Sequence, residues 1–534
     1  MSTQTTLEPA LRTAFHPRRP VVLHKRRHVL PSPPADAETR VYVDRQLGVL
    51  LIASVLSLTC LSVSQVHLIH LRGWLWFLVP FLVFTLGYYL ISLRVNLTSH
   101  NFDITTHRTL VAAWTPASYP TVDVWLPVCG EDLELLSNTW KHVARMRRRY
   151  PGSVTVYVLD DGDEAEAAEL ARSLGFTYIV RPDRGRLKKA GNLRNAYRNS
   201  EGEYIVILDA DFTPRDDFLL QTLPYMHHDP SLGILQTPQY FRQSAAQTLM
   251  ERGAGAVQEL FYRVVQVSRD LLDGAICVGS CGVYRRTALD SIGGTTQIEH
   301  SEDVHTGFDL RCAGWRLHYI PVPLATGVCP QEPDAFFTQQ YRWCAGSMSL
   351  LASAKFWRAK MPFSTRLCYL SGFCYYIHTA IATFLVPLIP IVLLAFLPEQ
   401  IQLRNYLWIA PSAAYTLVIF PMWNRARYGP SAMMAKSLYG WSHWFAIIDI
   451  LRKRRLGWHT TGATGRRPTR RIWVSMATWG GVTIAAWTGL CVYRMLTMTP
   501  VNFVFLMIMA LAYGTTCVAL PFVARAQGRR RLAT

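Results

Sequence analysis

Six long apolar runs divide the chain into two membrane-type regions with a polar block between them. Most of the runs approach the roughly 20 residues that an α-helix needs to cross a bilayer. The third run is long enough for a helix plus an interfacial piece, and its prolines Pro387 and Pro390 can kink a helix. We therefore predict about six spans. The runs are Leu47–Val66, Gly73–Ser92, Leu367–Phe396, Leu403–Met422, Ile472–Tyr493 and Val501–Val523.

The polar block between the second and third runs alternates short apolar segments with helical ones. Helical stretches such as Asp163–Leu174 and Ala190–Arg198 separate segments of strand character. This repeated order predicts an α/β domain with parallel strands over residues 121–351. Ligands of such sheets bind at the carboxyl ends of the strands. The predicted buried strands are Val122–Pro127, Val154–Leu159, Tyr178–Arg181 and Tyr204–Leu208.

Basic residues flank the apolar runs unevenly. They are dense before the first run, between the fourth and fifth, and after the last, and sparse in the short connections. The positive-inside rule then places both termini and the polar block in the cytoplasm, with the chain multi-pass in the cytoplasmic membrane and in contact with its lipid. The formal charge of +19 mostly reflects this bias. Because the charges flank membrane runs, nucleic acid is not an expected partner.

Two carboxylates, Asp209 and Asp211, close the apolar segment EYIVILDAD. Residues i and i+2 of a strand point to the same side, so both can approach one divalent cation, which prefers oxygen ligands. Such a cation would neutralise a diphosphate leaving group. The plain alternative is a surface loop, where D-x-D is common. The buried strand before it favours a metal site.

The LDDG segment follows another apolar strand, VTVYVL. Asp160 and Asp161 therefore lie at a strand end, and Gly162 permits a tight turn. Alone, the segment is little more than a turn signal. Lys189, in KKAGN, can meet a phosphate with help from the following helix N-terminus, whereas a solvated lysine is the plain alternative.

The SED segment, Ser301–Asp303, supplies a candidate general base. A hydroxyl that attacks an anomeric carbon must lose its proton, and a well-placed carboxylate can accept it. Asp303 is the better candidate, because Glu302 is expected to point away on a short strand or turn. His300 and His305 are neighbouring alternatives, although packing or surface histidines are commoner.

The QQYRW segment, Gln339–Trp343, combines two amides, a planar cation and an indole. Arg342 can hold a phosphate through two parallel donors. Trp343 can stack on a sugar ring through its apolar face. Near a membrane an Arg-Trp pair is commonly an interfacial anchor, but its place after three acidic motifs favours a binding role.

This ordered motif set resembles the processive family 2 glycosyltransferases, close to bacterial cellulose synthase catalytic subunits and similar to hyaluronan synthase and curdlan synthase-like enzymes. The resemblance covers about Leu47 to Val523. It implies a GT-A (Rossmann-like) α/β cytosolic domain inserted in an α-helical transmembrane bundle of about six spans. It also implies a hexosyltransferase activity that uses Mg²⁺ or Mn²⁺.

The resemblance assigns a role to each matching residue. Trp458 and Thr461 match a gating loop that closes over the bound nucleotide. The other assignments are Asp160 and Asp161 for uridine, Lys189 for the diphosphate, Asp209 and Asp211 for diphosphate and metal, Asp303 for the catalytic base, Gln339 and Arg342 for the donor, and Trp343 with Glu302 for the acceptor.

Three segments depart from the family pattern. PVCGE, Pro127–Glu131, stands where many relatives have P-T-Y-N-E, and Ser301 replaces the threonine of T-E-D. CVGSC, Cys277–Cys281, replaces F-C-G-S. These differences leave the sugar and the linkage open. No β-barrel segment follows the last run, so control by cyclic-di-GMP is not expected.

The sequence thus predicts an inverting, processive synthase that polymerises a UDP-sugar and secretes the polysaccharide through its membrane channel. UDP-glucose and a β-glucan are the first candidates. The growing polysaccharide is the acceptor, and accessory export subunits are compatible partners. Alternatives are a non-processive transferase to a lipid, as in glucosylceramide synthase, a chitin, hyaluronan or mannan-type synthase, and a transporter with an inactive domain.

The predicted domain boundaries follow from the runs and the motifs. They are a disordered cytosolic N-terminus at 1–44, a transmembrane hairpin at 45–95, the GT-A domain at 121–351, an interfacial segment with two spans at 352–430, an interfacial helix and gating loop at 431–471, two spans at 472–523 and a cytosolic tail at 524–534.

Overall fold

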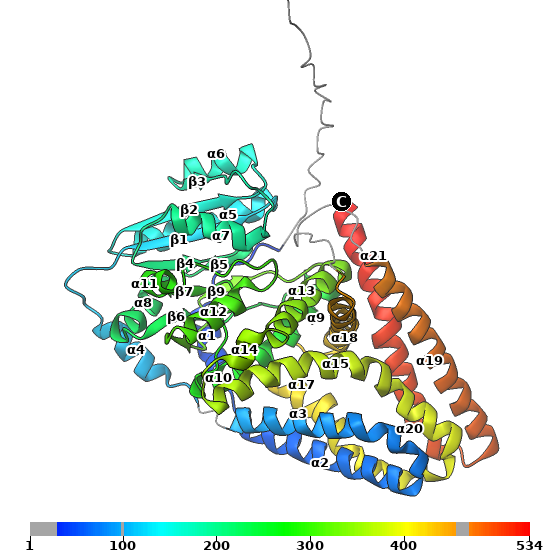
Figure 1. Ribbon diagram of the computed structural model, residues 1–534. Helices are drawn as coiled ribbons and strands as arrows, with labels where there is room; N and C mark the ends of the chain where they lie inside the picture. The colour runs from blue at the N-terminus through cyan, green and yellow to red at the C-terminus, as the bar shows by residue number, and fades with distance from the viewer. Residues whose placement is uncertain (1–28, 98–100, 455–468, 534) are drawn as a thin grey trace, which may run out of the picture.

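The protein pairs an α/β domain with a bundle of long helices, and α9 (Leu249–Leu260), α13 (Pro333–Leu351) and α18 (Pro430–Leu451) pack where the two meet (Figure 1). The computed structural model describes residues 29–97, 101–454 and 469–533. The predicted gating-loop residues Trp458 and Thr461 lie outside these ranges.

A seven-stranded mixed sheet forms the centre of the α/β domain. Its order is β3-β2-β1-β4-β7-β6-β8. The first four strands in this order pair in parallel, as predicted, whereas β7 runs antiparallel to both β4 and β6. The strands are β1 (Val122–Val128), β2 (Val154–Asp160), β3 (Thr177–Ile179), β4 (Tyr204–Ile207), β6 (Leu232–Gln236), β7 (Gly282–Arg285) and β8 (Arg316–Tyr319), with a separate pair of β5 (Phe212–Pro214) and β9 (Ala325–Gly327).

Helices cover both faces of this sheet, so its central strands are apolar on both sides. In β1, Val124 and Leu126 belong to one core cluster and Trp125 to the other. The helices of the domain are α4 (Ile104–Ala113), α5 (Leu133–Arg149), α6 (Ala165–Ser173), α7 (Lys188–Arg198), α8 (Phe218–His228), α10 (Gln266–Leu271), α11 (Arg286–Ser291), α12 (Glu302–Cys312) and α14 (Ala354–Arg358), with a π-helical turn η2 (Phe261–Val265) between α9 and α10.

Local chemistry sets the helix ends in this domain. The Asp132 carboxylate accepts a hydrogen bond of 2.8 Å from the Glu134 amide at the start of α5. Arg147, Arg148 and Arg149 occupy its last turn, where the helix dipole favours cations. The helix thus connects the carboxyl end of β1 at Val128 to the start of β2 at Val154.

Four helices within the described residues are long and apolar enough to cross a membrane. Their apolar side chains mostly face outward, as Ile52 does at 72% exposure, which suits contact with lipid. The third is one continuous helix despite its two prolines. The four are Leu47–Leu71 (α2), Gly73–Asn96 (η1, Gly73–Leu78, with α3, Val79–Leu97), α15 (Phe363–Phe396) and Val501–Arg530 (α20, Val501–Tyr513, η6, Gly514–Ala519, and α21, Leu520–Ala533).

The predicted count of six spans is not confirmed by these helices. Ile472–Tyr493 lies in α19 (Arg470–Thr497), which is long enough but rich in Trp, Gly and Thr, and these lower its hydropathy. The run Leu403–Met422 begins with the 3-10 helix η4 (Leu403–Trp408). One uninterrupted helical stretch follows, made of α16 (Ala410–Ala414), the π-helical turn η5 (Tyr415–Ile419) and α17 (Phe420–Trp423), and it is shorter than the roughly 20 residues that a span needs. A separate 3-10 helix, η3 (Pro398–Gln400), precedes this run.

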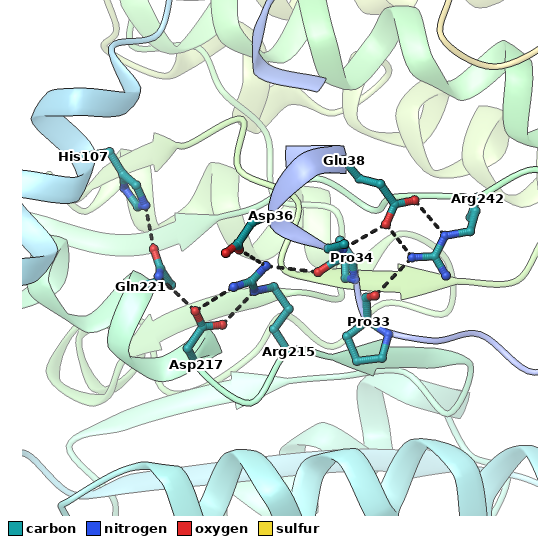
Figure 2. Close-up of polar contacts among 10 residues, drawn as sticks. Pro33, Pro34, Asp36, Glu38, His107, Arg215, Asp217, Gln221 and Arg242 are labelled. Atoms are coloured by element: carbon teal, nitrogen blue, oxygen red, sulfur yellow. Dashed lines mark hydrogen bonds and ion pairs between the residues drawn. The ribbon is translucent and has the colours of Figure 1, made fainter. Parts of the chain in front are cut away.

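The predicted disorder of residues 1–44 is wrong for residues 29–44, which pack on the α/β domain and include α1 (Asp36–Val43). Figure 2 shows Glu38 facing Arg242 and Asp36 facing Arg215, at 2.6 and 2.7 Å. Tyr42 is buried against Tyr240. Ion pairs and an aromatic contact thus hold residues 29–44 on the α/β domain. Residues 1–28 lie outside the described residues.

Candidate active site

One cavity of about 1190 Å³ runs from the carboxyl ends of β1, β2 and β4 to helices α3, α15 and α18. The structure brings most of the predicted site residues together in its wall. Those that line it are Asp161, Lys189, Asp209, Asp211, Glu302, Asp303, Gln339, Arg342 and Trp343.

Asp209 and Asp211 stand in the turn between β4 and β5, and Lys189 lies against them. The Lys189 ammonium pairs with Asp209 and donates a 2.7 Å hydrogen bond to the Gly279 carbonyl oxygen. Burial lowers the pKa of Lys189, whereas the negative charges of Asp209 and its acidic neighbours raise it by more, so the pKa of Lys189 lies above its ordinary value. Burial and the Asp209 carboxylate raise the pKa of Asp211 to about 7.

The Asp209–Asp211 pair fits a divalent cation that phosphate oxygens complete. Among the described residues, no group of three or more His, Cys, Asp or Glu side chains could hold a metal ion by itself. Magnesium is commonly held by one or two carboxylates together with substrate phosphates. The raised pKa of Asp211 reflects burial and repulsion from Asp209, and a cation would offset both.

Asp160 is fully buried and does not line the cavity. Its carboxylate accepts hydrogen bonds from the Gly162 amide at 2.6 Å, the Glu164 amide at 3.0 Å and the Tyr178 hydroxyl at 2.7 Å. Both oxygens are therefore used within the protein. In this structure Asp160 shapes the LDDG turn, and its neighbour Asp161 faces the cavity.

Asp161 is supported by a buried arginine that no motif indicated. Arg181 donates two hydrogen bonds of 2.6 Å to the two Asp161 oxygens. It also bonds Asp183 and the carbonyl oxygens of Arg186 and Lys188. The Arg181 guanidinium thus joins the LDDG turn to the segment that leads into Lys189. In the sequence, the only indication of this contact was the presence of an arginine just after the third strand.

The SED segment begins α12 rather than a strand or turn. Glu302 and Asp303 occupy its first turn and line the cavity, where Glu302 is buried and Asp303 is half-buried. The prediction that Glu302 points away is therefore wrong, because helical geometry replaces strand alternation. Ser301 adopts a left-handed φ of 54° and packs on α13, where a Cβ at Gly346 would collide with its hydroxyl.

Asp303 lies against the glycine of CVGSC. At Gly279, whose φ is 76°, a Cβ would lie 2.8 Å from the Asp303 Oδ2 atom. The Val304 amide donates to Asp303 Oδ1 at 2.8 Å. Burial and the adjacent Glu302 carboxylate raise the pKa of Asp303 to about 7. Such a carboxylate is suited to accept a proton near neutral pH.

The two histidines considered as alternative bases differ in position. His300 lines the cavity, whereas His305 does not. A ring nitrogen of His305 lies 3.1 Å from the Ser349 hydroxyl, and burial lowers the pKa of this imidazole. His305 is therefore a packing residue between α12 and α13.

The QQYRW segment lies within α13. Gln339, Arg342 and Trp343 share the cavity face at spacings of three and four residues. Tyr341 points the other way, and its hydroxyl donates to Asp449 of α18 at 3.0 Å. The helix thus presents three donor or stacking groups to the cavity while its back is fixed to α18.

Glu131 is a half-buried carboxylate of the cavity wall to which the motifs assigned no role. Burial raises its pKa to about 7, with further contributions from Asp160 and Asp209. The Cys129 amide donates to it at 2.6 Å. The sequence did contain an indication of this residue, because Glu131 stands just after β1 in the way that the LDDG carboxylates stand at the end of β2.

Residues 204–423 match the protein family described as glycosyl transferase family group 2. This stretch begins at β4 and contains the DAD, SED and QQYRW segments. The chain contains a family 2 glycosyltransferase domain. Its mixed sheet, with Asp209 and Asp211 after a central strand, is the GT-A-like arrangement expected of this domain.

Curated relatives of the glycosyltransferase domain include cellulose synthases. A cellulose synthase 1 catalytic subunit (UDP-forming) of Komagataeibacter xylinus is 34% identical over 261 residues, covering 48% of this chain and 35% of that protein. The catalytic subunit (UDP-forming) of Pseudomonas fluorescens is 33% identical over 270 residues, covering 49% and 36%. Cellulose synthase 1 of Komagataeibacter xylinus is 34% identical over 270 residues, but only 17% of it is covered. The chain thus spans about a third or less of these relatives.

A mannosyltransferase from Pyrobaculum calidifontis in complex with GDP-Man and Mn²⁺ is similar among solved structures. The match covers 70% of this chain and 99% of that one, at 15% identity and a TM-score of 0.48.

Proposed function

We propose that the protein is an inverting, processive synthase that transfers sugars from a UDP-sugar to a growing polysaccharide. The observation that carries this proposal is that one cavity is lined by Asp209, Asp211, Asp303 and Trp343 together with residues of α3, α15 and α18. Donor, base, acceptor and exit path would then share one connected space.

The donor would lie at the carboxyl ends of β2 and β4. Asp161 lines the cavity there and would face the nucleotide, and Lys189 with Arg342 would meet the diphosphate as charge-assisted donors. Asp209 and Asp211 would hold Mg²⁺ or Mn²⁺ beside it. When bound, the cation supplies neutralising charge for the departing diphosphate.

Asp303 would accept the proton of the acceptor hydroxyl. The hydroxyl oxygen then bonds to C1 of the donor sugar as the bond from C1 to the diphosphate oxygen breaks, and UDP leaves. Attack from the side opposite UDP inverts the anomeric centre. Trp343 would stack on the acceptor ring and Glu302 would accept a hydrogen bond from it, so the acceptor is oriented beside the base.

The continuation of the cavity supports a polymer product. Tyr375, Tyr376 and Tyr439 line it beside candidate membrane spans, and aromatic faces bind sugar rings. The basic loops favour a cytosolic position for both termini and the catalytic domain. The UDP-forming cellulose synthases among the relatives favour UDP-glucose as donor and a β-glucan backbone.

Product analysis tests this proposal. The purified protein in lipid nanodiscs would be incubated with labelled UDP-glucose and Mg²⁺ or Mn²⁺, and label would be partitioned between insoluble or high-mass polymer and organic-extractable lipid. Polymer is the expected destination. Label only in lipid would instead support a glucosylceramide synthase-like transferase, and label in neither fraction with any sugar nucleotide would overturn the assignment.

A further inference from the structure

Part of the cavity wall is formed by residues of α3, α10, α15 and α18, and we call this part the inner branch. Its charge differs from that of the catalytic end. Every Asp and Glu that lines the cavity lies between Glu131 and Asp334, within the glycosyltransferase domain. The inner branch carries two cations instead, Arg269 and Lys436.

Arg269 is a buried guanidinium without a carboxylate partner in the described part of the chain. It is 4% exposed, and its Nη2 donates to the Ser371 hydroxyl at 3.2 Å. Its Nε has no hydrogen-bond partner among the described residues. A Cβ at Gly372 would lie 2.9 Å from Nη2, so the guanidinium packs directly on the α15 backbone.

The titratable groups that act most on Arg269 are a thiol and three phenols, from Cys368, Tyr369, Tyr376 and Tyr88. Burial lowers the pKa of Arg269, yet arginine stays protonated in proteins. A buried charge without a partner is costly, and an anion that arrives with a ligand would offset that cost.

Lys436 provides the second cation from a different wall. It lies on α18 and is exposed, and its ammonium stands 5.9 and 5.7 Å from the ring centres of Phe420 and Tyr428. Aromatic faces stabilise an ammonium without neutralising it. Its charge is therefore available to a ligand in the inner branch.

We propose that the inner branch is a binding site for an acidic glycan, in which Arg269 and Lys436 meet the carboxylates of hexuronic acid residues in the growing chain. This inference rests on the proposed function and specifies its product. A planar carboxylate matches the guanidinium fork, and the neighbouring tyrosines suit the sugar rings. A neutral chain would offer hydroxyl oxygens but no compensating charge.

The chemistry needs no new step. A UDP-hexuronic acid would react as UDP-glucose does: the acceptor hydroxyl oxygen bonds to C1, UDP leaves, and the proton passes to Asp303. The carboxylate on C5 is unchanged and enters the inner branch with the polymer. Hexuronic acid would thus enter the chain alongside glucose.

The test uses the full-length protein in nanodiscs of uncharged phosphatidylcholine. UDP-glucose, UDP-glucuronic acid and both together would be supplied, with UDP release, product length and retention on an anion exchanger as readouts. We expect the product made with both donors to contain uronate and to be retained. Arg269→Gln and Lys436→Gln should each shorten the polymer made with both donors about tenfold, because each variant loses one charge-assisted contact to the chain. UDP release at early times should stay the same in both variants.

Matched variants separate charge from folding. Arg269→Lys and Lys436→Arg should restore product length, and Arg366→Gln, a cation of α15 that contacts the Trp357 and Ala359 carbonyl oxygens outside the cavity, should have no effect. A neutral product of unchanged length in all variants would overturn the inference of an acidic glycan and leave the proposed function standing. So would an effect of the variants that appears only in vesicles with phosphatidylglycerol, which would make a lipid phosphate the occupant. Failure of sugar transfer from every donor would overturn the proposed function as well.

Discussion

Arg181 donates two hydrogen bonds of 2.6 Å to Asp161, one to each carboxylate oxygen, and is itself 1% exposed. The pair fixes the acidic group that faces the cavity at the end of β2. Because the same guanidinium also bonds the carbonyl oxygens of Arg186 and Lys188, it ties that carboxylate to the approach of Lys189. The donor side of the site therefore depends on a residue that does not touch the cavity.

Arg181→Lys should weaken UDP binding while leaving the fold in place. Lysine keeps the charge but cannot form the two parallel bonds, and the loss of one such contact corresponds to about a tenfold weaker affinity. Calorimetric titration with UDP measures this, with Arg184→Lys as the exposed control. Unchanged UDP affinity in Arg181→Lys would show that Asp161 does not need this support.

Asp160→Asn and Asp161→Asn should separate stability from binding. Asp160 accepts hydrogen bonds from two backbone amides and a tyrosine hydroxyl. In Asp160→Asn the side-chain NH2 group would face one of these donors, which should lower the free energy of unfolding by about 1–3 kcal/mol. Asp161→Asn should mainly reduce UDP affinity. Thermal unfolding and UDP titration of both variants provide the comparison, and the reverse pattern would refute these placements.

Transfer should depend on pH through Asp303. Burial and Glu302 raise the pKa of Asp303 to about 7, so the base is mostly protonated below neutral pH and the rate should rise as pH increases through about 7. Glu302→Gln removes the adjacent like charge and should move this acidic limb to lower pH. The profile of kcat/KM against pH measures the limb, and a limb that stays in place would argue against this coupling.

Residues 29–44 should contribute to stability more through Tyr42 than through their ion pairs. Tyr42 is 5% exposed and packs edge-to-face on Tyr240 with ring centres 5.5 Å apart. Tyr42→Ala should cost about 3–5 kcal/mol, as other buried aromatic truncations do. Glu38→Ala should cost about 0–1 kcal/mol, because its pair with Arg242 is partly exposed. Thermal unfolding in detergent compares them; equal losses would contradict this ranking.

Sequence periodicity predicted the parallel strands and the strand-end carboxylates well, because both follow from short apolar segments such as EYIVIL before Asp209. It could not predict contacts between distant segments, such as Arg181 with Asp161 or Glu38 with Arg242. It also misjudged Glu302, since the choice between a turn and the first turn of α12 depends on packing of Ser301 against Gly346. The span count is not fixed by run length alone, because α19 is long but only moderately apolar.

Asp303→Asn tests the central claim most directly. The purified variant and the unmodified protein would be compared for polymer formation from labelled UDP-glucose and for UDP binding under the same conditions. The account predicts that Asp303→Asn binds UDP normally and forms no polymer, because only the proton acceptor is removed. Polymer formation by Asp303→Asn at the rate of the unmodified protein would contradict it.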